Sequence, residues 1–286
     1  EIAHIPSEGV MCSEKELGIS DSHLGIMDLP NTYEIGKDIK EYIPIEDVIV
    51  EIDNKSLTNR PDMWGHYGIA REIAAITDAI LRPLELYFVA NDLKDLDVEV
   101  IDEENCNRYS AIKIDNINEK VSPMDMKVIL YHCGMRSISL LVDLTNYIML
   151  EMGQPLHAFD SNQIDKIVVR NGEDNSKFMT LDKIERNISK DNLMICNSHE
   201  QLAIAGIMGG LKSEVLEETT SIVLESANFD ATNIRKTATA LGLRTEASAR
   251  YEKSLDPNMT VIAVRRFLKL LYDIDNDIVV ASNLTD

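Results

Sequence analysis

The side chains that could do chemistry in this sequence are an acid, an imidazole and two polar residues inside an apolar stretch. Glu225 stands at the end of an apolar run, residues 221–224, that is typical of a β-strand. His157 follows a Gly-Gln-Pro sequence, and Thr145 and Asn146 interrupt an otherwise apolar helical pattern. Such side chains either hydrogen-bond a ligand or only form hydrogen bonds within the protein itself. Spacing alone leaves both interpretations open.

A glycine-rich stretch with the sequence AGIMGG occupies residues 205–210, after another strand-like run. Glycine permits positive φ and close approach of a backbone, so this stretch is either a tight turn or part of a binding site. It is not a typical nucleotide-binding motif, because it lacks the GxGxxG spacing and no lysine follows in a P-loop position.

Composition restricts the class of protein. The 286 residues contain 28 Lys and Arg against 49 Asp and Glu, which gives a net charge of −21. A chain this acidic is a poor nucleic-acid binder on its own, since Lys and Arg supply most of the affinity for phosphate. No apolar run approaches the ~18 residues that span a bilayer, and the start, which lacks Met, resembles no signal peptide. Four separated cysteines without a CxxC favour buried free thiols in a reducing cytoplasm.

Periodicity and turn residues predict the elements that position these side chains. Asp62 is expected to cap a helix over residues 64–76 that turns Tyr67, Ile69, Ile73 and Ile76 toward a core. A second helix is expected from an N-cap at Ser122, with Pro123 at its first position, to Cys133, and others are expected over residues 140–151, 228–241 and 245–253 and from Asp256-Pro257 to Tyr272. Gly134, Gly153 and Gly242 are expected to end the first three of these helices. Strands are expected at residues 48–52, 98–100, 111–114, 167–170, 192–196, 202–205 and 221–224. This irregular order predicts an α+β fold, with a domain boundary near residue 90.

Taken together, the motifs resemble those of the β subunit of bacterial phenylalanyl-tRNA synthetases. They occur in that family's order and cover nearly the whole chain. Residues 7–17 also resemble the end of that subunit's tRNA-binding oligonucleotide fold. The motifs are LTNRPD at 57–62, GIARE at 68–72, VDLTNY at 142–147, GQPLHAFD at 153–160, AGIMGG at 205–210, LESA at 224–227 and LGLRTEAS at 241–248.

The resemblance implies a domain order and partners. Residues 1–90 would hold the end of the oligonucleotide fold and a small mixed B1-like segment. Residues 91–286 would form a B3/B4 editing domain with a β-rich core flanked by helices. In the family, a separate α subunit carries out aminoacylation, ATP and Mg²⁺ serve the whole synthetase, and the B3/B4 domain hydrolyses tyrosine wrongly attached to the phenylalanine tRNA. This chain would then meet the tRNA acceptor end beside the α subunit in an α2β2 heterotetramer, with no cofactor or metal of its own.

Carried over residue by residue, the resemblance assigns a tyrosine-binding pocket. A site built for phenylalanine rejects an added hydroxyl only about 10²-fold, so a second site that hydrogen-bonds the phenol is needed. Glu225 would accept that hydrogen bond. Gly206 and Gly209 would leave room for the ring, and Thr245 and Ala247 fall on further pocket positions.

The resemblance places Thr145, Asn146 and His157 at the end that receives the ester and the terminal adenosine, as the catalytic group. His157 would orient the attacking water or the ribose, and Thr145 with backbone N–H groups would polarise the carbonyl. No Ser or Cys stands beside a base in these motifs, so water rather than a covalent nucleophile is expected. The alternative is a non-catalytic module kept for subunit packing.

Overall fold

The structure, a computed structural model, describes residues 9–286 in two compact units. One unit comprises residues 9–53 and Val121–Asp143, and the other comprises Asn54–Lys120 and Leu144–Asp286. The first residues of the segment 7–17, compared above with the end of an oligonucleotide fold, lie outside the described residues. The assignment of domains to residues 1–90 and 91–286 stays a prediction.

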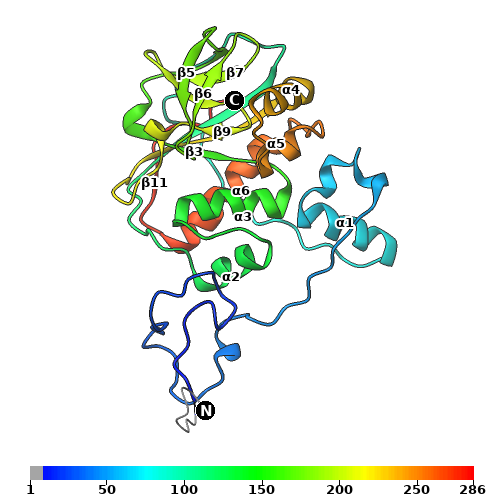
Figure 1. Ribbon diagram of the computed structural model, residues 1–286, viewed down its shortest axis with the longest axis vertical. Coiled ribbons are helices and arrows are strands. Elements are labelled where there is room, and N and C mark those ends of the chain that lie inside the picture. The colour runs from blue at the N-terminus through cyan, green and yellow to red at the C-terminus, as the bar shows by residue number, and fades with distance from the viewer. Residues whose placement is uncertain (1–8) are drawn as a thin grey trace. The chain divides into compact units, whose positions relative to one another are not determined.

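The larger unit is built on two sheets (Figure 1). The four-stranded sheet is antiparallel and has the order β11 (Val279–Val280), β2 (Cys106–Asp115), β10 (Ile222–Phe229), β3 (His157–Asp160). The five-stranded sheet has the order β1 (Val98–Val100), β4 (Ile167–Asn171), β7 (Leu193–Cys196), β8 (Gln201–Ile204), β9 (Met208–Gly209), and only its β1–β4 pair is parallel. A hairpin of β5 (Ser176–Met179) and β6 (Glu185–Ile188) forms a third, two-stranded sheet, and its Phe178 and Ile188 join the core.

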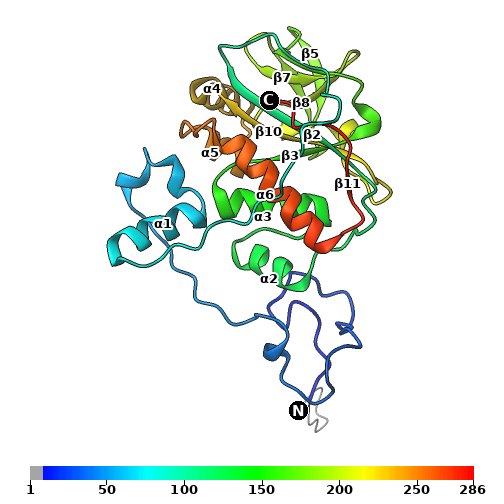
Figure 2. The ribbon, with the colours of Figure 1, turned by 180° about the vertical axis from the view of Figure 1, so that it is seen from behind.

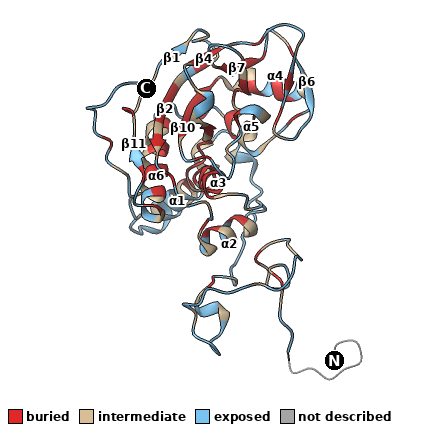
Figure 3. Cartoon of the chain, turned by 90° about the vertical axis from the view of Figure 1, so that its left-hand side faces the viewer, coloured by how far each residue is buried: buried red, intermediate tan, exposed pale blue. Residues whose placement is uncertain are grey.

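One hydrophobic core joins the two sheets. It contains Ala111 of β2 and Val223 of β10 together with Val169 and Ile204 of the five-stranded sheet. All eight residues of β10 are buried, because its other face is covered by α6 (Met259–Ile274), which also packs on β2 (Figures 2 and 3). A strand covered on both faces can bury an acid only if that acid serves a partner or a ligand.

Helices surround this core. The buried residues of α6 recur at the spacing i, i+3, i+4, i+7, which is the pattern of an amphipathic helix. The remaining helices of the larger unit are α1 (His66–Thr77), α4 (Ala231–Leu241), α5 (Glu246–Tyr251) and most of α3 (Leu140–Met152). No helix in residues 9–286 is both long enough and apolar enough to cross a membrane.

Several predicted elements are confirmed. Strands β1, β2, β4, β7, β8 and β10 overlap the six predicted runs from residue 98 onward, and the α+β class is correct. The glycines expected to end helices, Gly134, Gly153 and Gly242, all have positive φ. Thr245 is the N-cap of α5, and the structure adds β3, β5, β6, β9 and β11, which the sequence did not predict. The predicted helix at 228–241 begins only at Ala231, since β10 continues to Phe229.

The strand predicted at residues 48–52 is wrong, because this segment has no regular structure. Val48, Ile49 and Val50 are more than two-thirds exposed, so the apolar side chains that suggested a strand find no sheet to join. The expected core face of α1 is confirmed only in its first half: Tyr67 and Ile69 are half-buried, whereas Ile73 is 54% exposed and Ile76 is 75% exposed. Apolar periodicity predicted a helix there, but it did not predict what covers the helix.

Two predicted caps are wrong as well. Gly65, not Asp62, is the N-cap of α1, and hydrogen bonds from Arg60 and Arg71 lower the pKa of the Asp62 carboxyl to about 2. In the smaller unit, Pro123 is the N-cap of α2 (Met124–His132). Ser122 instead donates its hydroxyl to Asp143 at 2.5 Å.

The prediction of buried thiols holds for two of the four cysteines. Cys106 and Cys196 are buried, whereas Cys12 is half-buried and Cys133 is exposed, and all four are free. The smaller unit has its own small core, in which Ile19 and Ile43 pack with Val128 of α2. Cys133 follows this helix as its C-cap and faces outward.

Candidate functional site

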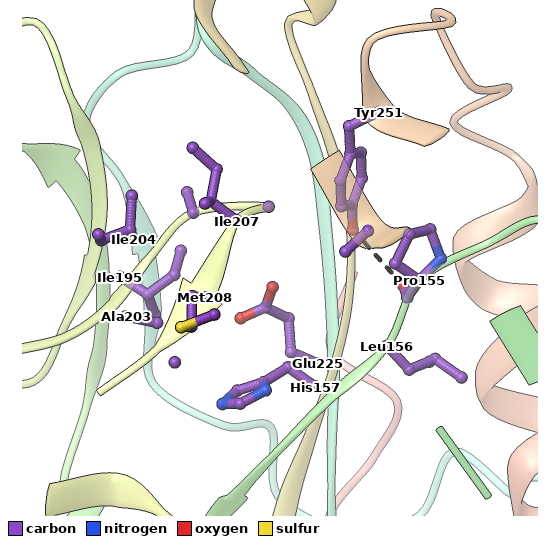
Figure 4. A pocket seen from close by; sticks show the side chains of 14 residues that line it. Pro155, Leu156, His157, Ile195, Ala203, Ile204, Ile207, Met208, Glu225 and Tyr251 are labelled. Atoms are coloured by element: carbon purple, nitrogen blue, oxygen red, sulfur yellow. Dashed lines mark hydrogen bonds between the residues drawn. The ribbon is translucent and has the colours of Figure 1, made fainter. Parts of the chain in front are cut away.

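A pocket lies in the larger unit where the strand β10 faces the β8–β9 turn and α5 (Figure 4). Its volume is about 70 Å³. Five of the eight predicted site residues line it together, although they come from four separate stretches of the sequence. The lining residues are Pro155, Leu156, His157, Ile195, Ala203, Ile204, Ala205, Gly206, Ile207, Met208, Gly209, Glu225, Ala247 and Tyr251.

Glu225 is the only acid among these described lining residues, and it is only 5% exposed. Side chains alternate along β10, so Glu225 faces the core between the sheets, on the side of Val223 and Ala227. Burial raises the pKa of the Glu225 carboxyl to about 7, because the surroundings are apolar, while a hydrogen bond from Tyr109 opposes this shift. In Figure 4 the carboxylate points into the space between Met208 and Tyr251.

His157 begins β3 and is paired directly with Glu225 across the β3–β10 ladder. Its ring stands edge-on to Phe159, with 4.5 Å between ring centroids. Burial lowers the pKa of the His157 imidazole to about 4, because the charged ring would lose its hydration. Its Nε2 is buried and has no hydrogen-bond partner within residues 9–286. A neutral imidazole with an open nitrogen can hold a water or a hydroxyl.

The glycine-rich stretch forms the turn between β8 and β9. Gly206 has a φ of +66° and is the third residue of the turn 204–207, which the Ile207 N–H closes by donating to the Ile204 carbonyl at 3.0 Å. A Cβ on Gly209 would lie 2.6 Å from His157 Cε1 and 2.8 Å from its Nε2. Gly206 therefore shapes the turn, and Gly209 leaves the space that the imidazole occupies. Both interpretations of this stretch, tight turn and pocket wall, are correct.

Thr245 connects α5 to this turn without lining the pocket itself. Its hydroxyl accepts a hydrogen bond from the Ser248 N–H at 3.1 Å and donates one to the Ile207 carbonyl at 3.0 Å. Ala247 and Tyr251, in the helix that Thr245 caps, do line the pocket. One N-cap thus fixes the helix and the loop that form opposite parts of the wall.

Thr145 and Asn146 lie on α3 and are not among the lining residues; Thr145 is buried and Asn146 half-buried. Their catalytic assignment stays a prediction. The sequence analysis missed Tyr251, whose hydroxyl reaches the Pro155 carbonyl at 3.5 Å, and Tyr109, whose hydroxyl reaches Glu225. Tyrosines in apolar helical and strand patterns look like ordinary core residues, so no signal in the sequence distinguished them.

The lining determines what the pocket can do chemically. None of the described lining residues is Ser, Cys, Thr or Lys, which are common covalent nucleophiles. Within the described part of the chain, no group of three His, Cys, Asp or Glu residues is placed to hold a metal ion. The arrangement can bury an apolar group, accept a hydrogen bond at Glu225 and orient a small polar group at His157.

Comparison with known proteins agrees with the motifs. The sequence model of the B3/4 domain matches residues 105–276. The chain is 46% identical over 278 residues to the phenylalanine–tRNA ligase β subunit of Clostridium tetani, covering 95% of this chain and 35% of that protein. It is 45% identical over 279 residues to the β subunit of Clostridium acetobutylicum, with the same coverage of both chains.

A solved N-terminal fragment of the phenylalanyl-tRNA synthetase β subunit from Pyrococcus horikoshii is 18% identical. It has a TM-score of 0.37 over 68% of this chain and 60% of that chain, which is too low to bear on the fold. The chain spans about a third of the length of the curated β subunits that it matches. Since the matched domain covers well over half of its residues, the chain belongs to the B3/4 domain family.

Proposed function

We propose that this chain is the proofreading part of a phenylalanine–tRNA ligase β subunit, and that its pocket hydrolyses tyrosine esterified to the phenylalanine tRNA. The observation that carries the proposal is the buried Glu225 carboxylate in a wall that is otherwise mostly apolar. An aromatic ring would be buried among the isoleucines, and its para-hydroxyl would donate to Glu225 in a charge-assisted hydrogen bond. Phenylalanine would leave the carboxylate without that partner.

The reaction is ester hydrolysis by water. Water attacks the carbonyl carbon, the bond to the ribose oxygen breaks, and a proton passes to that oxygen, which leaves free tyrosine and uncharged tRNA. The lowered pKa of His157 makes it a weak general base, so it orients the water or ribose through the open Nε2. An aminoacyl ester is already activated, and positioning supplies much of the rate.

The pocket has to widen when a ring enters. Its volume of about 70 Å³ is below the roughly 150 Å³ of an engineered cavity that holds benzene. Met208 stands beside Glu225 at the pocket wall and is only partly buried (Figure 4). Its flexible thioether side chain is the lining group best able to move aside.

The rest of the synthetase would deliver the substrate. With a net charge of −21, this chain would not hold tRNA by itself, so the α subunit and other parts of the β subunit would bring the acceptor end to the pocket in the cytoplasm. We assign ATP and Mg²⁺ to aminoacylation elsewhere in the assembly, since hydrolysis of an ester by water consumes neither. One carboxylate in an apolar wall is also a poor donor set for Mg²⁺.

The test uses the complete synthetase carrying Glu225→Gln. It measures deacylation of the phenylalanine tRNA charged with tyrosine and of the same tRNA charged with phenylalanine. We expect the preference for the tyrosyl ester to fall about 10- to 100-fold, because an amide is a weaker acceptor than a carboxylate. Glu103→Gln, at an exposed acid outside the pocket, is the matched control and should change nothing. An unchanged lifetime of tyrosyl-tRNA in Glu225→Gln would favour the alternative, a module kept for subunit packing.

A further inference from the structure

The acid of the pocket has a second partner that the proposed function does not use. Tyr109 lies on β2, opposite Ala227 of β10, and its side chain is 4% exposed. Its hydroxyl donates a hydrogen bond to Glu225 Oε2 at 2.8 Å. Tyr109 is not among the lining residues, so this hydroxyl reaches the carboxylate from the protein side while the carboxylate faces the pocket.

The hydroxyl of Tyr109 acts as a permanent donor. Burial, reinforced by the neighbouring carboxylate, raises the pKa of the Tyr109 phenol well above its usual value, so it keeps its proton at any physiological pH. It occupies one of the two oxygens of Glu225, and Oε1 is left to meet a ligand. The contact is chemically the one that a bound tyrosine would make, a phenol donating to the same carboxylate.

The same hydrogen bond opposes the effect of burial on Glu225. Desolvation favours the protonated acid, and the Tyr109 hydroxyl is the side-chain donor that favours the ionised form. No Lys or Arg forms an ion pair with Glu225 in the described part of the chain. The charge of the acceptor in this pocket therefore depends on one neutral hydroxyl.

We propose that Tyr109 is a positioning residue for tyrosine selection: by binding Glu225 Oε2 from the protein side, it fixes the orientation of the carboxylate and aims Oε1 at the para-hydroxyl of the ligand. The inference rests on the proposed function and assigns a role within it. Without the Tyr109 hydroxyl, Glu225 holds its proton to higher pH and is free to rotate. The pocket then presents a neutral acid, which accepts less strongly from a phenol.

The experiment uses the complete synthetase with Tyr109→Phe, which keeps the ring and removes the hydroxyl. Deacylation of the phenylalanine tRNA, charged either with tyrosine or with phenylalanine, is measured from pH 6 to 8.5 and corrected for uncatalysed hydrolysis. We expect the tyrosyl preference at pH 7 to fall about tenfold, its pH midpoint to move about one unit higher, and the preference to recover toward pH 8.5. Hydrolysis of the phenylalanyl ester should stay unchanged.

Ser110→Ala is the matched control. It removes a buried hydroxyl from the next residue of β2, whose side chain points to the other face and lies within hydrogen-bond distance of Thr260 Oγ1 and Asp286 Oδ1. It should lower stability without moving the pH profile. A Tyr109→Phe enzyme with the profile of the unaltered one would overturn the inference and leave the proposed function intact. An unaltered enzyme with no tyrosyl preference at any pH would overturn both.

A measurement on the unaltered chain keeps the inference testable if Tyr109→Phe does not fold. In ¹³C NMR, the Tyr109 ring carbon that bears the hydroxyl and the Glu225 carboxyl carbon should titrate with one shared midpoint near pH 7. Adding free tyrosine should shift both signals. A Tyr109 signal that stays constant while Glu225 titrates would rule out the coupling.

Discussion

Glu225 and His157 are direct cross-strand partners on β10 and β3, and both line the same pocket. Burial moves their pKa values in opposite directions, to about 7 for the acid and to about 4 for the imidazole. Each shift favours the neutral form, so the two groups form no ion pair between these pH values. The pair is an acceptor and an orienting group in an apolar pocket, and each half has a consequence that can be measured.

The first prediction concerns stability and the raised pKa of Glu225. The unfolded chain loses this proton near pH 4.5 and the folded chain near pH 7, so Glu225 lowers the free energy of unfolding progressively between these values. Glu225→Gln removes this loss. Relative to the unaltered chain, the free energy of unfolding of the variant should rise by about 3 kcal/mol between pH 4.5 and pH 8, as measured by urea unfolding. A stability difference that is independent of pH would contradict the raised pKa.

The second prediction concerns His157, for which the pH dependence of stability has the opposite sign to that of Glu225. Its folded pKa is lowered to about 4 from 6.5, so the unfolded chain takes up the proton first and stability falls as the pH drops from 6.5 toward 4. The ¹³Cε1 signal of His157 should be constant from pH 6 to 8 and titrate near pH 4. A midpoint near 6.5 for His157 would make it a usable general base and would contradict the orienting role.

A third prediction uses the contact between Gly209 and the imidazole. In Gly209→Ala the new Cβ would lie within 3 Å of His157 Cε1 and Nε2, so the ring must move. We expect tyrosyl-tRNA hydrolysis to fall at least tenfold because the water-orienting nitrogen is displaced. Gly242→Ala, where φ is +58° and no atom crowds the Cβ, should cost about 1 kcal/mol of stability and leave hydrolysis unchanged. Equal losses of activity in both variants would contradict this reasoning.

Local signals in the sequence predicted the ends of elements better than their surroundings. Gly153 and Gly242 end helices because a left-handed residue closes the last turn, and that preference depends on one residue. Whether an apolar segment is covered depends on distant parts of the chain. Residues 48–52 and Ile76 of α1 have the right pattern for burial and lie exposed, because nothing in residues 9–286 packs over them.

The pocket shows the same contrast between local signals in the sequence and contacts with distant parts of the chain. Glu225, His157, Gly206, Gly209 and Ala247 were assigned through the resemblance, and the structure brings all five to the lining of one pocket. Periodicity alone could not have joined them, since strand register sets which residues of β3 and β10 meet.

The resemblance did not indicate Tyr109, which reaches Glu225 across 116 positions of the sequence. Its residue type is ordinary for a strand, and its partner is fixed only by the pairing of β2 with β10. Such a contact between distant residues becomes visible only in three dimensions.

The last prediction separates the two roles of Thr245. Thr245→Ala removes the N-cap of α5 and the hydrogen bond to the Ile207 carbonyl, whereas Thr245→Ser keeps both. The alanine variant should lose about 1 kcal/mol of stability. Its rate of tyrosyl-tRNA hydrolysis should fall several-fold, because the turn at residues 205–207 no longer has a hydrogen bond to the N-terminus of α5. The serine variant should match the unaltered enzyme in thermal unfolding and in hydrolysis.

The control for this variant is a second N-cap. Asp230 caps α4 by accepting from the Asn233 N–H at 2.7 Å, and it is not among the lining residues of the pocket. Asp230→Ala should therefore cost a similar amount of stability without slowing hydrolysis. If both alanine variants slow hydrolysis equally, the loss follows from stability alone and Thr245 has no special link to the pocket. If only Thr245→Ala slows it, the bond to Ile207 holds the pocket wall in place.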